Sequence, residues 1–215
     1  MSVKLPNGIL FSLATAYSAS KPISAMTNAE PTVVTAVAHG LDDGDIVEVK
    51  SGWNPLNERV FKVDQLTTDT LSLLNTNTSD VTRYPTGGGA GSLRQVTTWQ
   101  QIQQITESST SGGEMQFTSY SFLENDFESQ LPTQASAQSL QLTIADDPAL
   151  PGYQALKRAA ETREVRALRA QLPDGSFILY NGYVSFNETP TMNKGSIMTV
   201  VATFSLMSRP VRYNA

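Results

Sequence analysis

The sequence predicts a mainly β fold: an antiparallel β-sandwich or barrel with one α-helix and a small all-β insertion. Three observations lead to this prediction. Apolar and polar residues alternate with a period of two along several segments, most regularly over residues 196–207. Turn-forming groups of Gly, Pro, Asp and Asn separate these segments. Helical spacing of apolar residues occurs clearly in one segment, where Tyr153, Leu156, Ala159 and Ala160 recur on one side.

The first third of the chain divides into a short start and a compositionally different segment. An apolar run over 9–16 follows the turn Pro6-Asn7-Gly8, and a second short strand is expected over 22–27. Four strands are expected next, over 32–38, 46–49, 60–63 and 70–74. The Gly-rich stretch 86–92 has the composition of a flexible linker. We therefore predict an inserted small β-domain over residues 30–92, and a core domain formed by residues 1–29 and 93–215.

The core domain continues with alternating strands and loops. We expect an extended, irregular strand over 93–105, a loop over 106–114, a strand over 115–123, an exposed loop over 124–137 and a strand over 140–144. Asp146-Asp147-Pro148 is a helix-start signal, although Pro151-Gly152 can delay that start. Three strands close the chain, over 165–172, 177–186 and 196–207. They are joined at Pro173-Asp174-Gly175 and Asn193-Lys194-Gly195.

Composition limits the classes of function. The 215 residues are 40% hydrophobic, enough for a packed core, but only 16% charged, against about 25% in an average soluble domain. A surface poor in charge and rich in small polar groups suits a protein that copies of itself will cover. The net charge is −5 and no segment forms a basic patch, so strong binding to DNA phosphates is not expected.

Catalytic, metal and cofactor sites are not expected. The chain has no cysteine and a single histidine, His39, which excludes thiolate chemistry and leaves any triad dependent on one side chain. Beside His39 lie Asp42, Asp43 and Asp45, and we interpret this segment as a turn because the spacing matches no set of metal ligands. No apolar run reaches 18 residues and the start does not resemble a signal peptide. We expect no membrane contact and synthesis in a cytoplasm.

The order of elements in the C-terminal half resembles the tail tube subunits of long-tailed bacteriophages. The matching pieces are Asp147, Pro151-Gly152, Ala155-Leu156, the Pro173-Asp174-Gly175 hairpin and Gly182-Tyr183-Val184, followed by the alternating final strand. The opening Leu5-Pro6-Asn7-Gly8 with its apolar strand is also similar. The resemblance covers residues 1–29 and about 93–215. The inserted segment instead resembles a small β-module first described in ubiquitin-activating enzymes and also found in phage virion proteins.

The resemblance implies a structural, non-enzymatic role in the virion. Six subunits would close into a ring, and stacked rings would form a tube that conducts DNA during ejection without binding it specifically. The partners would be further copies of the chain, the tape measure, the tail tip and the terminator. The insertion would lie outside the tube, where it would clash with a sheath, so a non-contractile siphovirus tail is expected.

Acidic residues in the loop 124–137 are the candidate site. Glu124, Asp126 and Glu128 form either a contact with the next ring or a solvated loop, and a catalytic carboxylate pair is the least favoured reading. Basic residues of the 157–169 segment are candidate partners for such a loop on a neighbour, or a solvated helix face.

Two other functions remain open from the sequence. The chain could be a tail terminator or another ring protein of the virion. Alternatively, the insertion could bind a host surface or a glycan, which is suggested by Trp53 and its loop.

Overall fold

The computed structural model describes residues 7–215 and is dominated by β-strands. Leu5 and Pro6 of the opening motif lie outside the described residues, whereas Asn7 and Gly8 form the expected turn. The elements of the first half are β1 (Leu10–Tyr17), β2 (Lys21–Ile23), β3 (Ala25–Met26), β4 (Thr32–Thr35), β5 (Ile46–Ser51), β6 (Arg59–Gln65), β7 (Thr70–Leu73) and β8 (Gly91–Ile102). Those of the second half are β9 (Ile105–Ser111), β10 (Met115–Tyr120), β11 (Ser129–Ala135), β12 (Ser139–Ala145), α1 (Pro151–Thr162), β13 (Val165–Gln171), β14 (Phe177–Thr191), β15 (Thr199–Leu206) and β16 (Val211–Tyr213).

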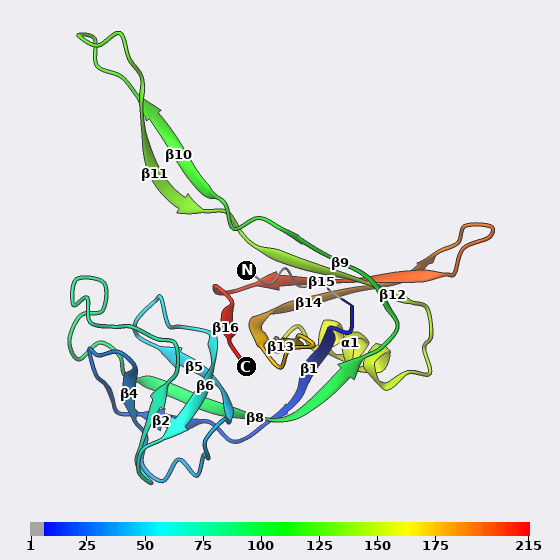
Figure 1. The fold of residues 1–215 in the computed structure, drawn as a ribbon, viewed down its shortest axis with the longest axis horizontal. Helices are drawn as coiled ribbons and strands as arrows, with labels where there is room; N and C mark the ends of the chain where they lie inside the picture. Colours follow the sequence, from blue (N-terminus) through cyan, green and yellow to red (C-terminus); the bar gives the residue numbers. More distant parts are fainter. Residues whose placement is uncertain (1–6) are drawn as a thin grey trace.

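One continuous, strongly curled antiparallel sheet contains most of the strands. Its order is β3-β4-β7-β6-β5-β8-β1-β13-β14-β15-β12-β9, with β2 paired to β8 and β16 paired to β14. The strand β8 is long enough to pair with β5 through its first half and with β1 through its second half. It therefore joins the strands of the inserted segment to those of the core (Figure 1). The mainly antiparallel β fold with one helix is confirmed.

The core forms where alternating strands direct their apolar faces toward α1. Leu140, Leu142 and Ile144 of β12 lie opposite Phe204, Ala202 and Val200 of β15, and all six are buried. The face of α1 that carries Tyr153, Leu156 and Ala159 is buried in the same cluster, which also takes in Phe11 and Leu13 of β1. The Tyr153 ring meets the Phe186 ring edge to face at 4.8 Å, a favourable aromatic geometry.

The inserted segment packs against the core through a second apolar cluster. That cluster includes Phe61, Val63 and Leu71 of the segment together with Ala167, Leu179 and Tyr213 of the core. Because these side chains share one buried region, the segment and the core are held side by side in the monomer. The structure does not test whether residues 30–92 fold independently, so the division into two domains stays a prediction.

Hydrogen bonds from the C-terminal part of the core also hold the inserted segment. The Tyr213 hydroxyl accepts a hydrogen bond from the Lys62 backbone N–H (2.9 Å) and donates one to the Leu74 carbonyl (3.1 Å). The Asn181 amide and the Ser208 hydroxyl both donate to the Glu58 carbonyl, at 3.0 and 2.9 Å. These bonds satisfy part-buried backbone groups in β6 and next to β6 and β7 that would otherwise lack this partner.

Several local predictions need correction. The segment 106–114 was expected to be a loop but mostly forms β9, and most of the second half of the expected loop 124–137 forms β11. Both strands expose nearly every side chain, so neither carries the apolar alternation that identifies a half-buried strand. The strand β14 continues to Thr191 and β16 was not expected at all. The helix begins at Pro151, the later of the two starts considered.

The stretch 86–92 is not a flexible linker. The Trp53 indole N–H donates to the Pro85 carbonyl at 2.8 Å, and the Ser51 hydroxyl donates to the Gly89 carbonyl at 3.2 Å. A Cβ atom on Gly89 would lie 2.8 Å from a side-chain atom of Met26. Close packing therefore requires glycine at positions 89 and 91, and β8 already begins at Gly91.

Candidate assembly surfaces

A polar sheet face is formed by β9, β12, β15 and β14. Their register aligns outward-facing residues into three cross-strand rows: Glu107-Thr143-Val201-Asn187, Ser109-Gln141-Thr203-Ser185 and Ser111-Ser139-Ser205-Tyr183. The opposite side of β12, β15 and β14 belongs to the buried apolar layer, whereas β9 exposes nearly every side chain. These four strands contain two charged residues, Glu107 and Glu188. The Glu188 carboxylate pairs with Lys157 of α1 at 2.8 Å, which leaves Glu107 as the single charged residue on the open face.

On both sides of this face, the outer strand edge has backbone groups that pair with no described strand. Among residues 7–215, the strand β9 is the last in the sheet order and pairs only with β12. On the side of β14 away from β15, pairing with β13 ends at Tyr183, so none of the described strands pairs with Val184–Thr191 there. Free N–H and C=O groups along a strand are a template for pairing with another chain. The face can therefore extend into neighbouring subunits from both edges.

A two-stranded hairpin, β10–β11, projects far from the body of the molecule (Figure 1). Apart from the half-buried Ser129, every side chain from Met115 to Ala135 is exposed. The hairpin nevertheless carries large apolar side chains, namely Met115, Phe117, Tyr120, Phe122, Leu123, Phe127 and Leu131. An isolated hairpin is marginally stable in water, and exposed apolar groups of this size indicate an interaction surface.

The predicted acidic residues lie together at the tip of this hairpin. Glu124, Asp126 and Glu128 are all exposed in the connection between β10 and β11, which is closed by a hydrogen bond from the Asn125 N–H to the Phe122 carbonyl (3.0 Å). The sequence has no Lys or Arg between Arg94 and Lys157. The tip is therefore acidic and apolar at once, without a basic side chain nearby on its own hairpin.

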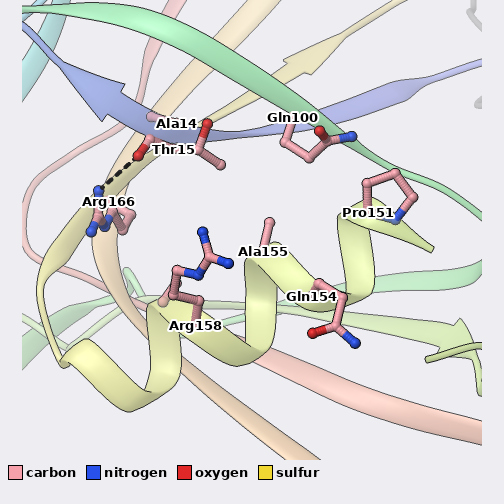
Figure 2. A pocket seen from close by; sticks show the side chains of 9 residues that line it. Ala14, Thr15, Gln100, Pro151, Gln154, Ala155, Arg158 and Arg166 are labelled. Atoms are coloured by element: carbon pink, nitrogen blue, oxygen red, sulfur yellow. Dashed lines mark hydrogen bonds between the residues drawn. The ribbon is translucent and has the colours of Figure 1, made fainter. Parts of the chain in front are cut away.

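Two of the basic residues of the 157–169 segment, Arg158 and Arg166, border a cavity between α1, β1 and β8. This cavity of about 430 Å³ is lined by Thr15, Gln100, Arg158 and Arg166, among others, and Figure 2 shows the two arginines facing it from α1 and β13. The Arg166 guanidinium already binds the Glu164 carboxylate at 2.7 Å. With Lys157 also paired, two of the five basic residues of this segment are bound to carboxylates within the subunit.

Comparison with known protein families identifies the chain. A family model described as phage tail tube protein, TTP, matches residues 51–215. The chain belongs to the phage tail tube protein family. No curated protein matches the chain closely enough to be counted as a relative.

Membership confirms the structural role expected from the resemblance: the chain is a tail tube protein of a bacteriophage virion. The matched span begins inside the segment predicted as an insertion and does not include residues 1–50. The likeness of residues 30–92 to a module of ubiquitin-activating enzymes therefore stays a prediction. Among residues 7–215 of this tail tube protein, no helix has the length and apolarity needed to cross a membrane.

Two side chains singled out in the sequence have structural roles. His39 is buried; its Nδ1 accepts a hydrogen bond from the Leu41 N–H (3.1 Å), which leaves Nε2 to donate to the Thr67 carbonyl at 2.9 Å. Both ring nitrogens are thus used in the turn. Trp53 is only 2% exposed and packs edge to face on Tyr84, so the side chain that suggested glycan binding is not available at the surface.

Proposed function

We propose that this tail tube protein closes into hexameric rings, and that the rings stack into a tube whose lumen conducts DNA. The observation that carries the proposal is the polar face of β9, β12, β15 and β14, bounded by unpaired strand edges on both sides. The ring number of six comes from the family resemblance.

Pairing between subunits would close the sheet. The free edge of β9 in one subunit would pair with Val184–Thr191 of β14 in the next, a heterologous contact that closes when the rotation completes a ring. Closure removes the exposed edges that otherwise lead to uncontrolled aggregation. The polar rows would then line the inside of the resulting barrel.

The chemistry of this lining suits DNA that must slide. Hydroxyl and amide groups dominate the three rows, and Glu107 repeats once per subunit. Without Lys or Arg on the face, DNA phosphates would release no counterions by binding there. Rings of carboxylates would repel the phosphates weakly and keep the DNA from sticking. We therefore propose passage of DNA without specific binding.

The projecting hairpin would connect successive rings. Its tip residues Glu124, Asp126 and Glu128 are the proposed inter-ring contact, supported by their exposure at the end of an arm that packs on nothing in the monomer. The apolar side chains of the same arm would be buried on stacking, which is the driving force that an acidic contact alone does not supply.

The inserted segment 30–92 is proposed to be a small domain on the tube exterior, because any other position would obstruct the lumen. A decorated exterior favours a non-contractile siphovirus tail, and a sheath seen around the tube would contradict this. The protein would be made in the bacterial cytoplasm. There it would assemble with the tape measure, the tail tip and the terminator.

Negative-stain electron microscopy of the concentrated recombinant protein tests the proposal. Long hollow tubes with external knobs are expected. Discrete rings that never stack would instead favour a tail terminator, and compact monomers at every concentration would contradict the ring proposal.

A further inference from the structure

Three arginines converge on a pocket at the junction between the inserted segment and the core. Arg59 and Arg83 come from the inserted segment, and Arg209 comes from the loop between β15 and β16. With Asn54, Asn57 and Met207 they line a cavity of about 320 Å³. No local sequence pattern marks this site, because its three cations lie far apart in the chain. Arg59 and Arg83 are 24 positions apart, and Arg83 and Arg209 are 126 positions apart.

The positive charge of this pocket is not balanced within the subunit. No carboxylate lies within ion-pair distance of Arg59, Arg83 or Arg209 among residues 7–215, whereas Arg94, Lys157 and Arg166 each have such a partner. Burial lowers the pKa of Arg59, and the nearby charges of Arg209 and Arg83 lower it further. A cluster of partly buried cations without a counter-ion is unfavourable, and an anion bound among them reduces that cost.

Arg59 is held in place for such a ligand. Its guanidinium donates to the Pro55 carbonyl at 3.2 Å and lies 5.1 Å from the centre of the Phe61 ring. Its Nε is buried without a hydrogen-bond partner. Arg83 lies 5.7 Å from the ring centre of Tyr84. Stacked guanidinium groups keep their N–H edges free for carboxylates.

We propose that this arginine pocket receives the acidic tip of the β10–β11 hairpin from another copy of the chain. Residues 114–135 contain Glu114, Glu124, Asp126 and Glu128 and no Lys or Arg, which gives the hairpin four negative charges and no positive charge. The proposal rests on the assembly proposed above and names the surface that the hairpin binds.

The surroundings of the pocket fit the apolar part of the tip. A second hollow of about 610 Å³ adjoins the arginine pocket, and the two share Met207, Ser208 and Arg209. Met207 is 44% exposed there. A tip that places carboxylates on the arginines can therefore place Phe122 or Phe127 against Met207.

The occupant has to come from another subunit. In Figure 1 the tip of the hairpin lies at the upper left and the inserted segment at the lower left, and the hairpin points away from the inserted segment of its own chain. The cavity beside Arg158 is a weaker receptor for the tip, because Arg166 is already bound to Glu164 and only Arg158 is left without a carboxylate partner.

Charge reversal on each side tests the contact. The receptor variant is Arg83→Glu with Arg209→Glu, and the tip variant is Glu124→Lys with Asp126→Lys and Glu128→Lys. All five side chains are exposed, so folding should be retained, as checked by circular dichroism and thermal melting. The critical concentration for tubes, measured by pelleting and microscopy, should rise at least about tenfold in either variant, because like charges would face each other. Combining both sets of substitutions should restore assembly.

A matched control is Arg158→Glu, which reverses an exposed arginine at the other cavity and should leave the critical concentration unchanged. Raising the salt from about 0.1 M to about 1 M shortens the Debye length from about 10 to about 3 Å and should weaken wild-type stacking. If the wild type forms tubes and the receptor variant forms them equally well, the docking proposal is wrong and the tube function stands. If the wild type forms no tubes, both fail.

Discussion

Replacing Tyr213 with phenylalanine should loosen the attachment of the inserted segment without disturbing the aromatic packing. The Tyr213 side chain is buried and its ring stacks on Phe177 with centres 5.1 Å apart, an arrangement that phenylalanine retains. Only the hydroxyl is lost. The Lys62 N–H and the Leu74 carbonyl, now bonded at 2.9 and 3.1 Å, then lose this partner.

The magnitude follows from these two bonds. A buried backbone group left without a partner costs about 1–3 kcal/mol, and the net value of one hydrogen bond is about 1 kcal/mol. Since both groups are only part-buried, Tyr213→Phe should lower the free energy of unfolding by about 2–4 kcal/mol. For a chain of this length the corresponding fall in melting temperature is about 4–16 °C.

Urea unfolding followed by circular dichroism measures the change, and amide hydrogen exchange at Lys62 reports on the local bond. The matched control is Tyr183→Phe, because Tyr183 is 43% exposed and its hydroxyl has no partner in the described structure. The control should stay within about 0.5 kcal/mol of the wild type. Equal stability of Tyr213→Phe and the control would refute the inference that Tyr213 holds the inserted segment.

Three further predictions concern other parts of the fold. Burial raises the pKa of Tyr17 and of Tyr213 from 10.0 to about 12. Because the unfolded chain loses these protons at a lower pH than the folded chain, the contribution of both residues to stability should be complete below pH 10 and fall between pH 10 and 12. Tyr17→Phe should reduce that fall, as measured by urea unfolding at a series of pH values. Gly182→Ala would place a Cβ atom 2.3 Å from the Ser205 carbonyl oxygen and should lower the free energy of unfolding by about 3 kcal/mol or more. Gly195 has open space around it but a φ of +85°, so Gly195→Ala should cost about 1–2 kcal/mol in the same assay. The Glu48 carboxylate is 1% exposed and lies 2.9 Å from the Arg94 guanidinium. Arg94→Met removes this partner and should lower the free energy of unfolding by about 3 kcal/mol. Adding Glu48→Gln should recover most of that loss, and no recovery would contradict the ion-pair explanation.

The sequence predicted the elements whose two sides face different environments. β12 and β15 alternate because one side packs on α1 and the other is polar, and the spacing of Tyr153 and Leu156 marked the helix for the same reason. The hairpin positions at Pro173-Asp174-Gly175 followed from turn chemistry, with Gly175 at a φ of +83°. Such local patterns require no knowledge of distant contacts.

The remaining features depend on contacts between distant parts of the chain. β9 and β11 expose nearly every side chain in the monomer, so neither shows the alternation of a half-buried strand. The Ser/Thr/Gly-rich composition of 106–114, and the acidic residues and Pro132 of 124–137, indicate loops instead. The composition of the Gly-rich stretch predicts a linker, because its packing on Trp53 and Met26 involves residues more than 30 positions away and leaves no local signal. The acidic tip residues were found as a local cluster, whereas the arginine pocket draws on segments far apart and was not visible in the sequence.

A helical reconstruction of the assembled tube by cryo-electron microscopy tests the central claim most directly. The account predicts that β9 of one subunit pairs with Val184–Thr191 of its neighbour and that Glu107, Gln141 and Thr203 face the lumen. A tube in which this polar face points outward, or in which both strand edges remain unpaired, would contradict it.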